Sequence, residues 1–127
     1  MDEALRQLPD HDYLYFADSA NAPYGERSPE WISQRSLSIC QSLADAGCQA
    51  IVVACNTATA YGLEDLRTAM KTWDIPIVVV GVVEAGARGV AESIDPSDGR
   101  RGVAVLATTG TCSSMAYPKA INASVGQ

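Results

Sequence analysis

The hydrophobic positions of this chain form short continuous runs that alternate with longer stretches of helical period. Continuous apolar runs typical of buried parallel strands occupy residues 50–54, 77–82 and 102–107, and a shorter aromatic run occupies residues 13–17. Helical spacing is found at 29–46 and 59–70, and shorter helices are expected near 86–92 and after residue 108. Strands that alternate with helices predict an α/β fold with an open, mainly parallel sheet and flanking helices.

The best-defined helix boundaries in the sequence surround the stretch 29–46. Ser28 offers a capping hydroxyl, Pro29 suits the first turn, and Gly47 suits the residue after the helix. Its apolar face is expected to contain Ile32, Ile39, Leu43 and Ala46, widened by Leu37, Cys40 and Ala44. Pro118 is expected to kink or shorten the last helix.

Polar clusters follow each expected strand, at residues 18–25, 55–57, 84–86 and 108–111. In open parallel sheets, ligands bind outside the carboxyl ends of the strands. We therefore expect the four clusters to lie along one edge of the sheet. The most informative of them is Cys55, Asn56 and Thr57, because it brings a thiol, an amide and a hydroxyl to the end of a buried strand.

Composition excludes several classes of function. The 127 residues are expected to form one compact unit, and their net charge of −6 with nine scattered basic residues argues against a nucleic-acid partner. No apolar run approaches the length of a bilayer span, and the polar start lacks a signal peptide, so a cytoplasmic location is expected. The four cysteines form no C-x-x-C pair and His11 is the only histidine, so neither a metal site nor a disulfide is expected.

Four segments, in order, resemble the glutamate racemases. They are the stretch from Tyr15 to Asp18 continuing into Ala22–Ser28, the strand end at Ala54–Ala58, the turn at Gly81–Ala87, and the segment Leu106–Thr111 followed by Ser114 and Tyr117. The third carries Ala85 where the family usually has proline. The resemblance extends from about Leu14 to Ile121.

The resemblance implies a cofactor-independent amino-acid racemase, an isomerase that interconverts L- and D-glutamate for peptidoglycan synthesis, and hence for the cell wall and cell shape. In that family two cysteines exchange the α-proton from opposite faces of the substrate, which binds between two similar α/β domains. By this resemblance Cys55 is one of the two bases. The substrate contacts implied for glutamate are Tyr24, Gly25, Asn56, Thr57, Thr108 and Thr111.

The chain also departs from the family pattern. The opening Asp-Ser-Gly turn and the later Cys-Thr-His motif are absent, and none of the other three cysteines stands in such a motif. We therefore expect an internal piece of the family fold, half of the two-domain arrangement. Residues 1–95 would form most of the first domain without its first strand, and residues 96–127 the start of the second. Unpaired sheet edges would favour a homo-oligomer or poor solubility.

Each site residue also has a purely structural interpretation. Cysteine is among the most buried residue types, and Asn56, Thr57, Thr108 and Thr111 could simply cap helices. One alternative function is an inactive or half-site remnant that only binds an acidic amino acid or a partner subunit. A thiol hydrolase or redox protein ranks last, because no histidine partner for Cys55 and no C-x-x-C pair is visible. A related racemase that acts on aspartate or another substrate is a further alternative.

Overall fold

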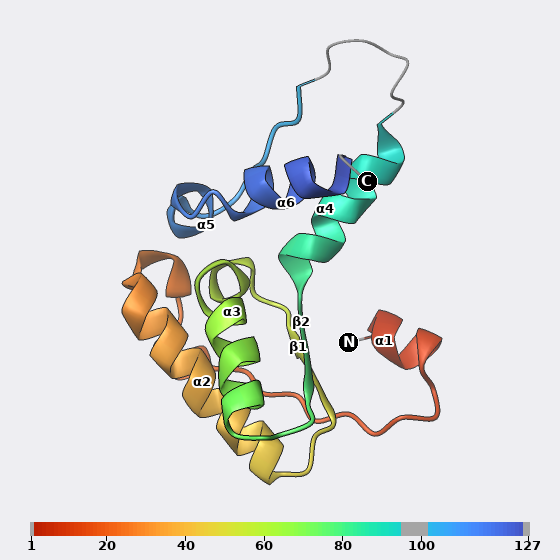
Figure 1. The fold of residues 1–127 in the computed structure, drawn as a ribbon, viewed down its shortest axis with the longest axis vertical. Coiled ribbons are helices and arrows are strands. Elements are labelled where there is room, and N and C mark those ends of the chain that lie inside the picture. The colour runs from red at the N-terminus through yellow and green to blue at the C-terminus, as the bar shows by residue number, and fades with distance from the viewer. Residues whose placement is uncertain (1, 95–101, 126–127) are drawn as a thin grey trace.

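A computed structural model of the chain describes residues 2–94 and 102–125 (Figure 1). The elements in order are α1 (Asp2–Gln7), the short 3₁₀ turns η1 (Ser19–Asn21) and η2 (Tyr24–Glu26), α2 (Pro29–Asp45), β1 (Ala50–Val53), α3 (Asn56–Thr72), β2 (Val78–Gly81), α4 (Val82–Ser93), α5 (Thr109–Ser113) and α6 (Ala116–Val125). No helix within these ranges is long and apolar enough to cross a membrane.

The centre of the fold is a parallel pair of strands covered on one face by helices. β1 and β2 pair in register from Ala50 opposite Val78 to Val53 opposite Gly81. The core on the covered face consists of Cys40, Ile51, Leu63, Leu66, Met70 and Val79. The expected α/β class with an open parallel sheet and flanking helices is therefore confirmed.

The other face of the sheet is uncovered. The side chain of Val52 is 66% exposed and that of Val78 is 62% exposed, and Val80 on the same face is also exposed. Figure 1 shows α2 and α3 together on the opposite side of the strands. Alternation of side chains along each strand explains this division, because Ile51 and Val79 point into the core and their neighbours point away.

The edge of β2 that faces away from β1 is contacted by an arginine side chain. The backbone N–H of Val78 donates to the carbonyl of Gln49, the residue before β1, so the next carbonyl, that of Val79, points away from β1. Arg67 of α3 reaches around this edge and its Nε donates to Val79 O at 3.2 Å. The free edge of β2 is thus partly closed by a charged side chain.

The boundaries of α2 follow the sequence signals. The hydroxyl of Ser28 accepts a hydrogen bond from the backbone N–H of Trp31, and Pro29 occupies the first turn. Gly47 has a φ of 86°, a left-handed conformation that glycine adopts without a steric penalty.

The buried face of α2 differs from the expected one. The expected Ile32 and Cys40 are buried and the expected Leu37 and Leu43 pack against the core, but the face also contains Ser33 and Ser36, and Ala46 is exposed. The small serines face α3 and permit a close approach, since a Cβ at Gly62 would lie 3.3 Å from the Ser36 side chain.

Two expected strands are wrong. Residues 13–17 and 102–107 lie outside any strand, and apolar side chains in them, including Tyr15 and Leu106, are exposed. A strand is defined by its hydrogen-bonded neighbour, and within the described residues only β1 and β2 have one. The expected surface loop at 96–101 lies outside the described residues.

Two helices begin earlier than predicted. The expected helix 59–70 extends over Asn56–Thr72 because Cys55 acts as its N-cap, and the expected helix 86–92 begins at Val82 as soon as β2 ends.

The last expected helix is divided in two, but not at Pro118. The break lies at Met115, whose φ of 56° interrupts the helical path between α5 and α6. Pro118 is the third residue of α6, within the first turn, where backbone N–H groups have no acceptor inside the helix. α6 packs against α4 (Figure 1) and brings the C-terminal part of the chain back over the strand ends.

Candidate functional site

Cys55 stands where β1 ends and α3 begins. It is the N-cap residue of α3, with an extended backbone (φ −92°, ψ 122°), and its side chain is exposed. Its sulfur accepts a hydrogen bond from the backbone N–H of Ala58 at 3.5 Å. A sulfur in this place faces the positive end of a 17-residue helix, which stabilises negative charge.

Three threonine hydroxyls close a ring next to Cys55. The hydroxyl oxygens of Thr57, Thr108 and Thr111 lie 3.0 to 3.1 Å from one another. Thr108 donates to Thr111, so with one proton on each hydroxyl Thr57 donates to Thr108 and Thr111 donates to Thr57. The ring joins the N-terminus of α3 to the cap of α5, where Thr108 also accepts from the backbone N–H of Thr111.

Asn56 is oriented by a residue that was not among the expected site residues. Tyr117 of α6 donates its hydroxyl to Asn56 Oδ1 at 2.8 Å. With this oxygen engaged, the amide NH₂ is the group of Asn56 that can donate to a carboxylate. The ring of Tyr117 lies against Gly86, where an added Cβ would approach within 3.1 Å. The sequence gives only a weak signal for this role, namely the position of Tyr117 shortly after a strand-end cluster.

The loop before α2, which carries Tyr24 and Gly25, meets the start of α5 next to the threonine ring. A Cβ on Gly25 would lie 3.0 Å from Thr108 Cβ, and a Cβ on Gly110 would lie 3.0 Å from the carbonyl oxygen of Gly25. The loop and the start of α5 therefore meet closely, and a Cβ at either glycine would require its neighbour to shift by a few tenths of an ångström. Tyr61 of α3 adds a hydrogen bond to Gly110 O at 2.8 Å.

The side chain of Tyr24 is held by Asp18 and by aromatic packing. Its hydroxyl donates to Asp18 Oδ2 at 2.5 Å, and its ring meets that of Trp31 edge to face at 5.3 Å. Burial, followed by the neighbouring Asp18 carboxylate, raises the pKa of Tyr24 to about 12. The phenol is therefore protonated throughout the neutral range.

Three of the four expected clusters thus meet at one place. Residues 18–25, 55–57 and 108–111 meet through Gly25, Thr57, Thr108 and Thr111. The side chains of Tyr24, Cys55 and Asn56 have their contacts elsewhere, with Asp18, the start of α3 and Tyr117 respectively. The fourth cluster contributes only through Gly86. Its Glu84 faces α3 instead, where it forms an ion pair with Arg67 at 2.9 Å.

The other three thiols differ from Cys55 in their surroundings. Cys40 is buried in the core, and burial raises the pKa of its thiol to about 11. Cys48 is half-buried at the amino end of β1. Cys112 is exposed on α5, where its sulfur contacts Ala107 O at 3.8 Å.

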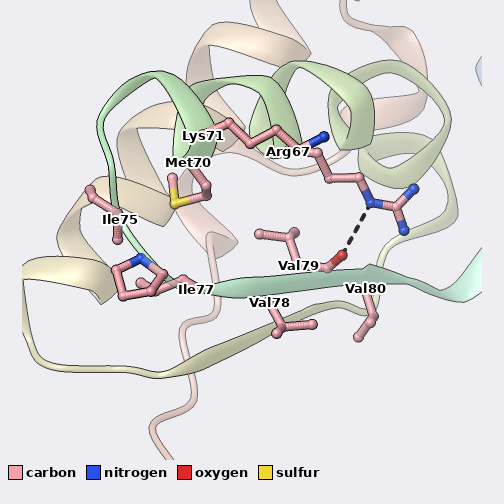
Figure 2. A pocket seen from close by; sticks show the side chains of 9 residues that line it. Arg67, Met70, Lys71, Ile75, Ile77, Val78, Val79 and Val80 are labelled. Atoms are coloured by element: carbon pink, nitrogen blue, oxygen red, sulfur yellow. Dashed lines mark hydrogen bonds between the residues drawn. The ribbon is translucent and has the colours of Figure 1, made fainter.

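The described residues contain no group of three side chains suited to hold a metal ion. A pocket of about 500 Å³ lies between α3 and β2, lined by Met70, Ile75, Pro76, Ile77 and three valines together with Arg67 and Lys71 (Figure 2). Its lining is mostly apolar, and it borders the segment that enters β2 rather than the strand end at Cys55. It is therefore separate from the polar cluster.

The polar cluster has the parts that proton chemistry on an amino acid requires. It presents one accessible thiol, an amide NH₂ group and the exposed hydroxyl of Thr108 at the carboxyl end of a parallel sheet, with the hydroxyls of Thr57 and Thr111 buried behind it. Hydroxyl, amide and backbone N–H donors suit a carboxylate whose charge increases as its α-proton leaves.

Comparisons with known proteins identify the family of the chain. The sequence model of the Asp/Glu/Hydantoin racemase family matches residues 1–126. Glutamate racemase from Geobacter metallireducens is 45% identical over 119 residues, which cover 94% of this chain and 41% of that protein.

Solved structures give the same result. Glutamate racemase from Aquifex pyrophilus superposes with a TM-score of 0.82 at 34% identity, over 96% of this chain and 45% of that one. Glutamate racemase from Francisella tularensis, solved with D-glutamate, gives 0.78 at 30% identity, over 95% and 42% of the two chains. The chain spans about two fifths of the length of the relatives it matches. It belongs to the Asp/Glu/hydantoin racemase family.

Proposed function

We propose that this chain carries one half of a glutamate racemase site, with Cys55 as the base for one face of the α-carbon. The observation that carries the proposal is the placement of Cys55: an exposed thiol at a strand end and helix N-terminus, two residues before the threonine ring. The family membership and the D-glutamate complex of the Francisella tularensis relative support glutamate as the substrate.

The reaction proposed is the cofactor-independent interconversion of L- and D-glutamate. The thiolate of Cys55 removes the α-proton and becomes a thiol, while the electron pair left on the α-carbon is delocalised into the carboxylate. A second acid on the opposite face then supplies a proton and completes the inversion. The product, D-glutamate, would serve peptidoglycan synthesis in the cytoplasm.

The remaining site residues receive binding roles in this proposal. Asn56 donates its amide to a substrate carboxylate, and Tyr24 and Gly25 form the wall beside it. Thr57, Thr108 and Thr111 contribute hydroxyls, whose protons are all used within the ring in the absence of substrate. A substrate carboxylate that accepts a hydrogen bond from the Thr57 hydroxyl therefore replaces the hydrogen bond from Thr57 to Thr108.

The direct test is exchange of the α-proton of L- and D-glutamate with D₂O, followed by proton NMR. Replacing a general base lowers a rate by about 10²- to 10⁴-fold, so Cys55→Ser should reduce exchange by at least about 100-fold. Cys48→Ser is the matched control, because this half-buried thiol lies at the opposite end of β1. Equal exchange by wild type and Cys55→Ser would remove Cys55 from the mechanism.

A second candidate function is a remnant that binds an acidic amino acid or a partner subunit without turnover. The observation that favours it is the uncovered sheet face, on which Val52 and Val78 are exposed and available to a partner. It predicts shifts of the Asn56 and Thr57 NMR signals on addition of glutamate but no α-proton exchange with either enantiomer. That combination would replace the racemase proposal.

A further inference from the structure

The carboxylate of Asp18 accepts several hydrogen bonds from different side chains, and the proposed substrate contacts do not explain them. Arg35 donates to it twice, from Nε at 2.8 Å and from Nη2 at 2.7 Å. Tyr24 donates its hydroxyl at 2.5 Å, and Asn21 donates its amide at 2.9 Å. The Asp18 side chain is only 12% exposed. A shielded carboxylate with a two-point guanidinium contact is a much firmer anchor than an exposed surface ion pair.

The anchor joins a rigid element to an irregular one. Arg35 lies in the middle of the 17-residue helix α2, whereas Asp18, Asn21 and Tyr24 belong to the irregular stretch and short 3₁₀ turns that precede it. A 3₁₀ turn of three residues has little stability of its own, so the position of this stretch depends on its contacts with α2. Two such contacts hold Tyr24: its hydrogen bond to the Asp18–Arg35 ion pair, and the edge-to-face packing of its ring on Trp31 of α2.

The position of Tyr24 affects the site through the next residue, Gly25. Gly25 is in van der Waals contact with Thr108, whose hydroxyl bonds to Thr57, and its carbonyl oxygen lies against Gly110. A shift of this turn by a few tenths of an ångström would either open the contact with Thr108 or force it to move.

We propose that Asp18 and Arg35 are positioning residues of the site, which hold Tyr24 and Gly25 against Thr108 and so keep the substrate wall beside Cys55 in place. The assignment rests on the proposed function only for its catalytic readout, since the coupling between Asp18 and Thr108 can be measured without turnover.

The protonation states of the network agree with this role. The Arg35 guanidinium, followed by the Tyr24 hydroxyl, holds the pKa of Asp18 well below its usual range. Asp18 is therefore an acceptor and Tyr24 a donor throughout the neutral range. The direction of each hydrogen bond is fixed, and the turn does not change its anchor as the pH varies around 7.

The first test is kinetic, with α-proton exchange of glutamate as the assay. Asp18→Asn keeps the size of the side chain but removes its charge, and Arg35→Met removes the guanidinium while keeping a long apolar side chain. Each should raise KM about tenfold, which corresponds to about 1.4 kcal/mol, with kcat changed less than about twofold. Arg35→Lys, which keeps the charge but loses the two-point contact, should recover part of the affinity.

The chain contains a matched control pair. Arg67 and Glu84 form a second two-point ion pair, at 2.9 and 3.0 Å, between α3 and α4. Arg67→Met and Glu84→Gln should leave KM unchanged at a comparable loss of thermal stability. A rise in KM that merely followed loss of stability in both pairs would overturn the positioning role.

The second test does not need activity. In the full chain with labelled threonine methyl groups, Asp18→Asn and Tyr24→Phe should shift the NMR signals of Thr108 and Thr57, and Arg67→Met should not. Methyl signals that stay at their wild-type positions in Asp18→Asn would overturn the inference, whether or not wild type exchanges the α-proton. Shifted methyls in a chain without exchange would support the coupling and reject only the proposed function.

Discussion

Two cysteines of this chain, Cys40 and Cys55, occupy opposite environments on neighbouring helices. Cys40 is packed in the core between α2 and the sheet, and Cys55 is exposed at the start of α3. Burial opposes the charged form of Cys40 and leaves its thiol neutral, whereas Cys55 has solvent and a helix N-terminus beside it. A residue type alone therefore does not indicate reactivity.

The buried thiol of Cys40 predicts a specific alkaline sensitivity. Its folded-state pKa is raised to about 11, above the value of about 8.5 for an unfolded cysteine. The unfolded chain therefore loses this proton first, and stability that is present below pH about 8.5 is lost as the pH rises towards 11. Urea midpoints measured between pH 7 and pH 10 should fall more steeply in wild type than in Cys40→Ala. Parallel curves would show that Cys40 ionises as freely in the folded chain as in the unfolded one.

How much could be read from the sequence differs from residue to residue. The place of Cys55 follows from a β-branched run that ends in polar residues, and this local pattern survives in the structure. The roles of Asp18, Arg35 and Tyr117 could not be read in this way, because Asp18 and Arg35 are 17 positions apart and Tyr117 is 61 positions from Asn56. Only the folded backbone brings such side chains together.

At the scale of elements, the contact between the end of β2 and α3 is unusually close. A Cβ on Gly81 would lie 2.3 Å from Thr59 Cγ2 and 2.9 Å from Leu63 Cδ2. Gly89 in α4 has no neighbour within 4 Å of its would-be Cβ. Close packing therefore explains the glycine at position 81, whereas no contact explains the glycine at position 89.

This difference predicts opposite effects of the same substitution. Gly81→Ala should lower the free energy of unfolding by about 1–3 kcal/mol, because the added methyl group overpacks the core. Gly89→Ala should raise it by about 0.5–1 kcal/mol, because alanine is the better residue in a helix interior. Urea denaturation of both variants checks this, and a neutral Gly81→Ala would mean that α3 moves away from β2 at little cost.

Elements with local determinants were predicted best. α2 begins at its Ser28 cap and ends before Gly47, as its sequence indicates. The aromatic run 13–17 and the apolar run 102–107 have the composition of strands, yet neither is one here. Composition measures only how well a segment would suit a sheet, whereas strand formation also requires an adjacent strand with a free edge.

For the molecule as a whole, the most important feature is the exposed apolar face of its sheet. Val52 and Val78 share an uncovered face, and β1 carries no charged side chain, whereas the edge of β2 is partly closed by Arg67. An edge strand with no charged side chain lacks one of the devices that prevent pairing with other chains.

We therefore expect self-association that depends on β1. Val52→Lys places a charge on this strand and should shift the chain towards monomer in sedimentation velocity experiments. Gln34→Lys, a change on the exposed side of α2, provides a control that adds the same charge at a distance from the sheet face. If both variants sediment as wild type does, β1 is not the contact surface.

The threonine ring has a consequence for the order in which the molecule folds. Thr57 is 51 positions from Thr108 and 54 from Thr111, whereas α2, β1, α3 and β2 follow one another through short connections. Closing the long loop costs chain entropy that the local unit does not have to overcome, so the helix-covered strand pair can form before the ring closes. The contacts of Gly25 with Thr108 and Gly110 are then the last part of the fold to be completed and the first to open, by a local fluctuation that leaves the core intact.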